Sequence, residues 1–166
     1  MTLKNLLFFV LVIFFTIFFQ SSALNILVIA HIKPDLVLIV ACYIGLYWGE
    51  KTGTCLGFLL GLLQDIFSGG LLGLNALTKT LFSYLCGKAG KRLNIKNMVV
   101  QVLLIALSSL LEGILFLFVL RIFHLRKEIH ETFFHLVLPQ TLYTMILTPI
   151  VFRLINFLHQ KWGPLR

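Results

Sequence analysis

The chain has 166 residues, of which 59% are hydrophobic and 12% charged, and its mean hydropathy is +0.99. Soluble domains carry about 25% charged residues, and a soluble protein of this size has too much surface to hide so many apolar side chains. The composition therefore excludes an ordinary soluble enzyme and predicts a single integral membrane domain. We interpret the net charge of +8 as basic residues flanking membrane spans, not as a nucleic-acid interface.

The apolar stretches predict an all-α protein with about six transmembrane helices, over residues 6–23, 36–48, 54–67, 72–87, 98–120 and 132–157. The first stretch could also be a secretory signal peptide, because Lys4 precedes an apolar run. Its charge-free length favours a retained span. The second and third stretches are short for a hydrocarbon core of about 30 Å, so we expect them to tilt little, to be re-entrant or to sit behind other helices.

The charged pair Glu50–Lys51 predicts a turn between the second and third spans. The alternative is one long helix here and five spans in all, but this would bury both charges at a cost of several kcal/mol. Basic residues in the loops predict the orientation, because Lys and Arg accumulate on the cytoplasmic side. Both termini are then cytoplasmic, and the inner segments hold Lys4, Lys51, Lys88, Lys91, Arg92, Lys96, Arg153, Lys161 and Arg166. The outer segments hold Lys33, Arg121, Arg126 and Lys127.

Glycines recur every fourth residue from Gly45 to Gly61. Residues four apart lie on nearly the same face of a helix, and small residues there let two helix backbones approach closely. The pattern predicts a packing seam, either within this chain or against a partner helix. The candidate packing residues are Gly53, Gly57, Gly61 and Gly73.

Several polar residues fall within or near the spans and predict an intramembrane polar network. They are Gln64, Asp65, Asn75, Lys79 and Glu112. A charge in hydrocarbon usually finds a partner or water, and the expected topology places Lys79 and Glu112 at the same depth. We expect Lys79 to pair with Asp65, with Glu112 or with both. The alternatives are a ligand or proton site and a side chain that reaches an interface.

Catalytic and metal-binding patterns are not evident in the sequence. There is no HExxH, GxSxG or phosphate-binding glycine loop, and the three cysteines have no zinc spacing. The histidines His124, His130 and His135 have spacings that do not suit one helix face. We therefore expect no enzyme activity, no cofactor and no metal.

The segment Gly57–Leu77, which reads GFLLGLLQDIFSGGLLGLNAL, resembles the MreD family of bacterial rod shape-determining proteins. The resemblance continues through Tyr84, Gly87 and the basic turn Lys88–Arg92. Lys79 departs from it, since an apolar residue is expected there. The positions that fall on the family pattern are Gly57, Gly61, Asp65, Gly73, Asn75 and Tyr84.

The resemblance implies a non-catalytic, multi-pass subunit of the elongasome in the bacterial inner membrane, which directs lateral peptidoglycan synthesis. It implies a fold similar to the six-helix substrate-binding components of energy-coupling-factor transporters. The implied partners are MreC above all, with MreB, RodA and a class B penicillin-binding protein as further members of the complex. The alternative function is that of a vitamin-binding transport component, which shares the architecture.

Overall fold

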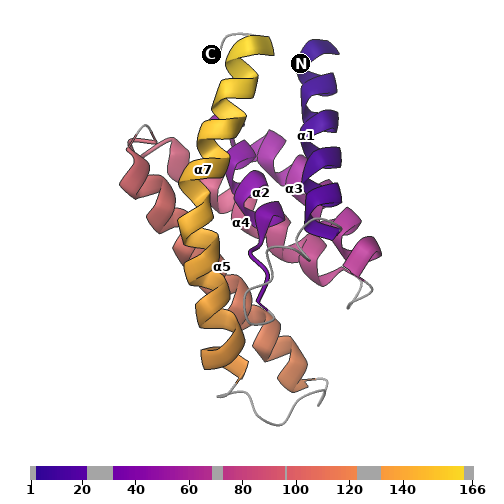
Figure 1. The fold of residues 1–166 in the computed structure, drawn as a ribbon, viewed down its shortest axis with the longest axis vertical. Coiled ribbons are helices and arrows are strands. Elements are labelled where there is room, and N and C mark those ends of the chain that lie inside the picture. Colours follow the sequence, from indigo (N-terminus) through magenta and orange to yellow (C-terminus); the bar gives the residue numbers. More distant parts are fainter. Residues whose placement is uncertain (1–2, 22–31, 69–72, 96, 123–131, 163–166) are drawn as a thin grey trace.

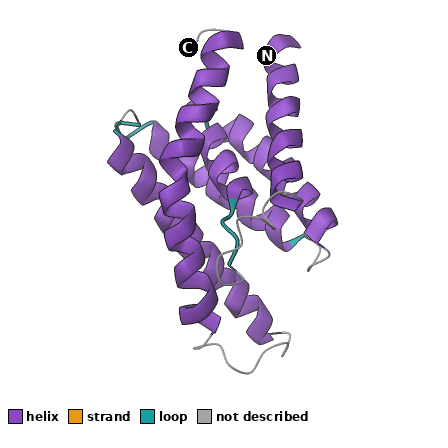
Figure 2. Cartoon of the chain, viewed as in Figure 1, coloured by secondary structure: helices purple, strands orange, loops and turns teal. Residues whose placement is uncertain are grey.

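The computed structural model describes residues 3–21, 32–68, 73–95, 97–122 and 132–162, and the described chain is built of helices (Figure 2). The helices are α1 (Leu3–Ser21), α2 (Leu36–Trp48), α3 (Glu50–Ser68), α4 (Leu74–Gly90), α5 (Met98–Ile122) and α7 (Leu138–Trp162). A short π-helical turn, η2 (Phe133–Val137), leads directly into α7. The beginning of α1 and the end of α7 lie at the same end of the molecule (Figure 1).

Helix α2 is the centre of the bundle. Every residue from Val37 to Leu46 is buried, and α2 contacts α1, α3, α4, α5 and α7. At 1.5 Å per residue its 13 residues rise about 20 Å, less than the thickness of a bilayer core. The shortness has a simple explanation, because a helix that other helices surround need not reach both lipid surfaces. We expected this short stretch to tilt little, to be re-entrant or to sit behind other helices, and α2 sits behind other helices.

The corner between α2 and α3 is tighter than the sequence suggests. A single non-helical residue, Gly49, separates the two helices with a φ of 85°, and glycine takes such an angle at little steric cost. The expected turn at Glu50–Lys51 is wrong, because α3 begins at Glu50. An acidic residue is favourable there, since the N-terminal end of a helix carries partial positive charge. The alternative of one merged helix is also wrong, because α2 and α3 are separate helices.

The glycine seam lies inside the chain. A Cβ atom on Gly57 would meet the Lys79 carbonyl oxygen at 2.8 Å, and one on Gly53 would meet the Gly45 Cα at 2.6 Å. A Cβ atom on Gly61 would meet the Ala76 Cα at 2.5 Å. The seam therefore packs α3 against α4 and α2, which answers the alternative left open by the sequence. It is not a free face for a partner helix.

The end of the chain contains one long helical segment that continues through two prolines. Helix α7 contains Pro149, and Pro139 is its second residue, with one residue between it and the π turn. A proline ring collides with the preceding helical turn and removes one N–H donor, and a wider π turn is a common local adjustment to such strain. The remaining helix ends lie within a few residues of the expected bounds. Residues 22–23 and 72, expected in the first and fourth spans, lie outside the described residues.

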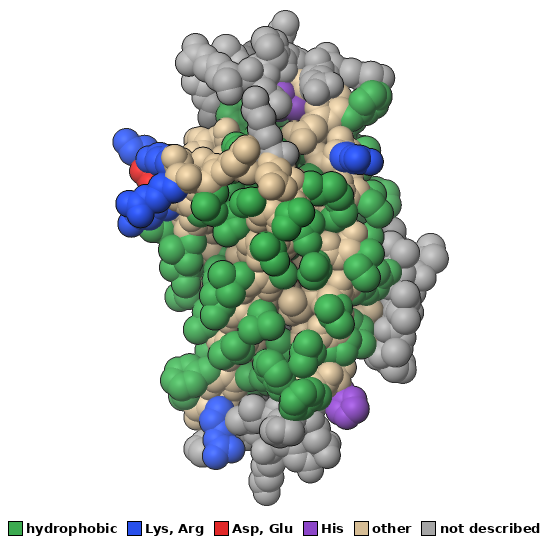
Figure 3. All heavy atoms as spheres, turned by 90° about the vertical axis from the view of Figure 1, so that its left-hand side faces the viewer, with side chains coloured by type: hydrophobic (Ala, Val, Ile, Leu, Met, Phe, Trp, Pro, Cys, Tyr) green, Lys and Arg blue, Asp and Glu red, His purple; other side chains and the backbone are tan. Residues whose placement is uncertain are grey.

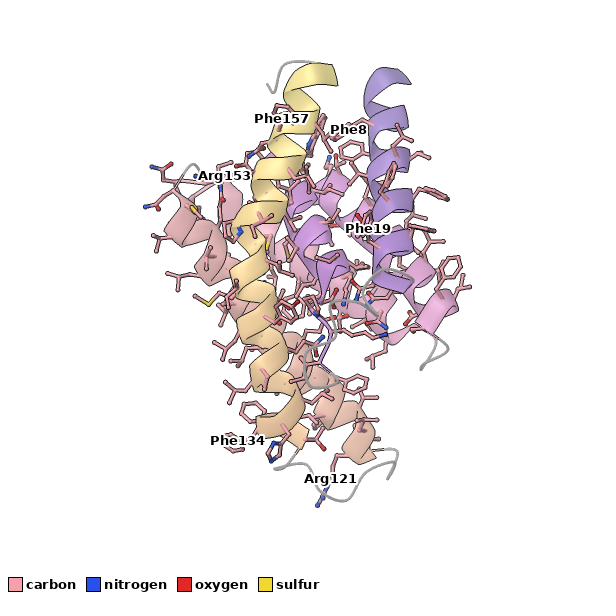
Figure 4. The ribbon with its side chains drawn as sticks, viewed as in Figure 1. Phe8, Phe19, Arg121, Phe134, Arg153 and Phe157 are labelled. Atoms are coloured by element: carbon pink, nitrogen blue, oxygen red, sulfur yellow. The ribbon has the colours of Figure 1, made fainter. Side chains whose placement is uncertain are left out.

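The surface of the bundle is an apolar belt. Hydrophobic side chains cover the middle of the face shown in Figure 3, with Lys and Arg above and below. Figure 4 places Arg121 and Phe134 at one end of the molecule and Phe8 and Phe157 towards the other. Two helical segments, Met98–Ile122 and Phe133–His159, are long and apolar enough to cross a membrane. The most exposed apolar side chains include Phe14, Phe67, Leu77, Val99, Phe118, Ile146 and Ile150.

Candidate functional site

The most unusual feature of the interior is the buried lysine Lys79 on α4, whose side chain is 0% exposed. Its ammonium group donates a hydrogen bond of 2.6 Å to Asp35 Oδ2 and a second to Glu112 Oε1. A longer contact of 3.5 Å joins it to Asn75 Oδ1, one turn back on the same helix. An ammonium has three N–H donors, so these three acceptors use its full capacity.

The partners of Lys79 are only partly those expected. The expected pair with Glu112 is present, whereas the second carboxylate is Asp35 and not Asp65. Asp35 precedes the first turn of α2, and its Oδ1 accepts the Leu38 N–H at 2.8 Å. It is thus the N-cap of the central helix. Its place directly before an apolar run was a sequence signal for a cap, but nothing in the sequence indicated that the same carboxylate reaches Lys79.

Asp65 has a different task from the one expected. Its two oxygens accept the backbone N–H groups of Gly73, Asn75 and Ala76 at 2.9 to 3.2 Å. They also accept the Asn75 side-chain amide at 2.9 Å. The first N–H groups of a helix have no partners within the helix and attract negative charge. Asp65 therefore connects the last turn of α3 to the start of α4, where the partial positive charge of the helix end compensates the carboxylate.

The ion-pair network joins four parts of the bundle. Glu112 lies on α5 and also accepts the Thr78 hydroxyl at 2.8 Å. Asp35 reaches α7 through its backbone N–H, which donates to Thr144 Oγ1 at 3.1 Å. Thr144 in turn donates to the Gln140 carbonyl at 2.8 Å. Lys79 thereby connects α4 to α5 directly and to α2 and α7 through Asp35.

The physical effect of such a network is to fix geometry more than to add stability. Removing ions from water costs several kcal/mol each, and their mutual attraction repays this only with good geometry and full hydrogen bonding. In an apolar bundle, however, charges that come from α4, α5 and the start of α2 can all be paired in only one relative arrangement of these helices. Lys79, Asp35 and Glu112 therefore select the register between α4, the start of α2 and α5.

A small open cavity of about 180 Å³ lies beside this network. Its polar lining residues come from α3, α4, α5 and α7 and from the start of α2, and its apolar lining residues come from α4, α5 and η2. The lining residues are Asp35, Gln64, Leu74, Asn75, Thr78, Ser109, Glu112, Gly113, Phe116, Leu136, Val137 and Gln140. The cavity contains the predicted residues Gln64, Asn75 and Glu112, while Asp65 lies outside its lining.

The remaining candidates divide between packing and turn formation. Gly53, Gly57 and Gly61 belong to the internal seam already described. Gly73 precedes α4 with a φ of 94° and serves as its N-cap position. Among the described residues, no three His, Cys, Asp or Glu side chains are grouped as a metal site would require.

Helices wrapped in an apolar belt, with their charges paired inside, define the class of a helical membrane protein whose interior chemistry holds helices together. The family comparison identifies the branch of this class. The model of the rod shape-determining protein MreD matches residues 2–161 of the chain. The chain belongs to the MreD family, and the predicted resemblance is confirmed. It is thus a rod shape-determining membrane component of the cell envelope.

No curated protein and no solved structure matches the chain. The expected likeness to the substrate-binding components of energy-coupling-factor transporters therefore stays a prediction, and the alternative function of vitamin binding gains no support. The MreD family is one of shape-determining structural proteins.

Proposed function

We propose that this chain is a non-catalytic, multi-pass subunit of the elongasome in the bacterial inner membrane. It binds MreC through helix packing and works beside RodA, a class B penicillin-binding protein and MreB to keep lateral peptidoglycan synthesis in a rod-shaped pattern. The observation that carries the proposal is the family match, which extends over residues 2–161. The apolar belt and the paired interior charges agree with a role in which helices meet other helices in the bilayer.

The site that we propose for MreC is the exposed outer end of α3 and α4. The internal glycine seam is already occupied, so a partner must use side chains on the outside of the bundle. Ile66 and Phe67 at the end of α3 and Leu77 on α4 are 58%, 63% and 62% exposed. They lie close to Asp65 and to the start of α4, which Asp65 caps. Exposed large apolar side chains can serve as anchors of an interface with a partner.

Site-specific photocrosslinking in cells tests this surface. A photoreactive phenylalanine analogue is placed at Phe67 or at Leu77 in the full-length chain, which is co-expressed with tagged MreC. Matched control positions are Ile146 and Ile150 on α7, which are 66% and 60% exposed. We expect crosslinks to MreC from the first two positions and not from the controls. Crosslinks from α7 alone would reject the α3–α4 surface, and no MreC crosslinks from any position would reject direct binding through either surface.

The proposed orientation has its own test. Helix α5 runs from Met98 towards Arg121, so the basic Lys88–Arg92 turn lies at the end opposite Arg121. Positive charge favours the cytoplasmic side, so we propose that this turn and both chain ends lie in the cytoplasm. Green fluorescent protein fused to the C-terminus should fluoresce, and alkaline phosphatase fused there should be inactive. The opposite result would reverse the topology.

A further inference from the structure

Among the described residues, the cavity beside Lys79 has more carboxylates than cations next to it. Asp35 and Glu112 contribute two carboxylates to its wall, and Lys79 contributes the one cation that contacts both. Asp65 does not alter the sum, because the start of α4 compensates it. With both carboxylates ionised, these described residues carry one more negative than positive charge, and uncompensated charge is costly in an apolar surrounding.

The hydrogen-bonding groups of the wall also favour a donor. The hydrogen bonds that Glu112 accepts from Lys79 and Thr78 both use Oε1, so its second oxygen is left for another donor. Gln64 lines the cavity, and its buried Oε1 has no hydrogen-bond partner among the described residues. Buried polar atoms almost always have a partner. The wall thus offers two acceptors, one on Glu112 and one on Gln64, to a hydrogen-bond donor.

The volume and the lining of the cavity restrict the kind of cation that it could bind. A volume of about 180 Å³ would hold roughly six waters at about 30 Å³ each, which is much more space than a bare alkali ion needs. Part of the lining is apolar and comes from Leu74, Phe116 and Val137. These side chains offer no oxygen ligands to an alkali ion. An ammonium group on a short carbon chain suits such a mixed lining, since its N–H groups can bind the carboxylates and its methylenes can contact the apolar side chains.

We propose that this cavity binds a protonated primary amine, which goes beyond the proposed scaffold function and does not depend on it. The amine donates to Glu112 and Gln64 and neutralises the excess charge beside Lys79. Among the apolar lining residues, Phe116 and Leu136 are each 37% exposed. The same ammonium chemistry could come from the headgroup of an aminophospholipid or from a free amine.

Native mass spectrometry of the full-length chain in detergent tests the proposal and separates the two sources. The protein is titrated with ethanolamine and with phosphatidylethanolamine. The matched controls are choline and phosphatidylcholine, whose quaternary ammonium groups have no N–H to donate. We expect binding of a primary amine in preference to its quaternary counterpart. Binding of phosphatidylethanolamine alone would identify a lipid headgroup site, and binding of ethanolamine as well would identify a site open to free amines.

Two variants connect the binding to this cavity. Glu112→Gln removes the excess charge and should weaken amine binding by about thirtyfold or more, as expected when one partner of a buried charge pair is lost. Gln64→Leu should also weaken it while leaving the Lys79 ion pairs in place. Glu50→Gln is the matched control, because it removes a carboxylate at the α2–α3 corner, and it should leave binding unchanged.

Three outcomes would overturn the proposal. These are equal binding of primary and quaternary amines, no binding of either, and full displacement of ethanolamine by an equal concentration of sodium ion. Loss of binding in Glu50→Gln equal to that in Glu112→Gln would also do so, because the effect would then be general electrostatics. If Glu112→Gln fails to fold, the wild-type comparison of amines and Gln64→Leu decide the question. MreC crosslinking is a separate readout, so failure of this proposal leaves the proposed function standing.

Discussion

Replacing Lys79 by methionine tests the interior network most directly. Methionine keeps a long unbranched stem that can fill the same space, but it removes the ammonium group. Asp35 and Glu112 are then left together in a buried site without the cation that both contact. Breaking a buried ion pair by removing one partner costs about 3–5 kcal/mol, because an uncompensated charge remains.

The expected effect is large enough to measure by thermal unfolding. For a chain of this size, about 1 kcal/mol corresponds to a change of roughly 2–4 °C in the unfolding midpoint. Lys79→Met should therefore unfold roughly 6–20 °C below the wild type. The measurement is the intrinsic fluorescence of the purified protein in detergent during heating, with Trp48 and Trp162 as the reporters.

Two further variants make the result specific. Lys91 pairs with Glu50 at 2.9 Å in an exposed position, so Lys91→Met removes a lysine where exposed ion pairs contribute little. Its midpoint should stay close to that of the wild type. The triple variant with Lys79→Met, Asp35→Asn and Glu112→Gln removes all three charges and should recover much of the lost stability. The reasoning is refuted if Lys79→Met unfolds with the wild type, or if the triple variant is no more stable than the single one.

Three other predictions concern the glycine seam and the ends of the helices. Gly61→Ala should lower the free energy of unfolding by about 1–3 kcal/mol through overpacking, because its Cβ would lie 2.5 Å from the Ala76 Cα. The control in the same unfolding assay is Leu59→Ala, at a site that is 43% exposed. Asp65→Asn should cost about 1.5–3 kcal/mol, the range for hydrogen bonds to a charged group, and an unchanged midpoint would contradict the capping role. The hydrogen bond from Lys91, together with its charge, lowers the pKa of the Glu50 carboxyl, so Lys91→Met should raise that pKa in an NMR titration. The contribution of this pair is present above the unfolded pKa of Glu50 and is lost as the pH falls through the folded pKa.

The sequence predicts the helices well because long apolar runs have few alternatives in a membrane protein. The α2 bounds agree with the stretch expected over residues 36–48, since Pro34 and Asp35 mark its start and Gly49 marks its end. The start of α3 is the main error. Glu50 and Lys51 are charged, and charge at the end of an apolar run indicates a loop in a sequence although it is compatible with the first turn of a helix.

The partners of the buried charges are a harder problem. The expected depth of Lys79 and Glu112 made their pairing one of the alternatives that the sequence left open, because both lie on spans whose ends are well marked. Asp65 and Asp35 could not be distinguished in the same way. Both lie near span ends on the same side, and the choice depends on how far α3 and α4 converge at their corner. Backbone N–H groups at the start of α4 donate hydrogen bonds to Asp65. Asp35 is therefore the carboxylate that pairs with Lys79.

The network also explains how two differently packed parts of the bundle hold together. Helices α3 and α4 pack along the glycine seam, where backbones approach closely, and α5 packs mainly on α7. Helix α4 touches α5 in few places, and Lys79 with Glu112 is one of them. Apolar contacts in lipid give weak preference for one register over another, because the lipid tails are as apolar as the side chains. A buried charge pair has such a preference, so Lys79 and Glu112 set how the exposed end of α3 and α4 is held relative to the long helices α5 and α7.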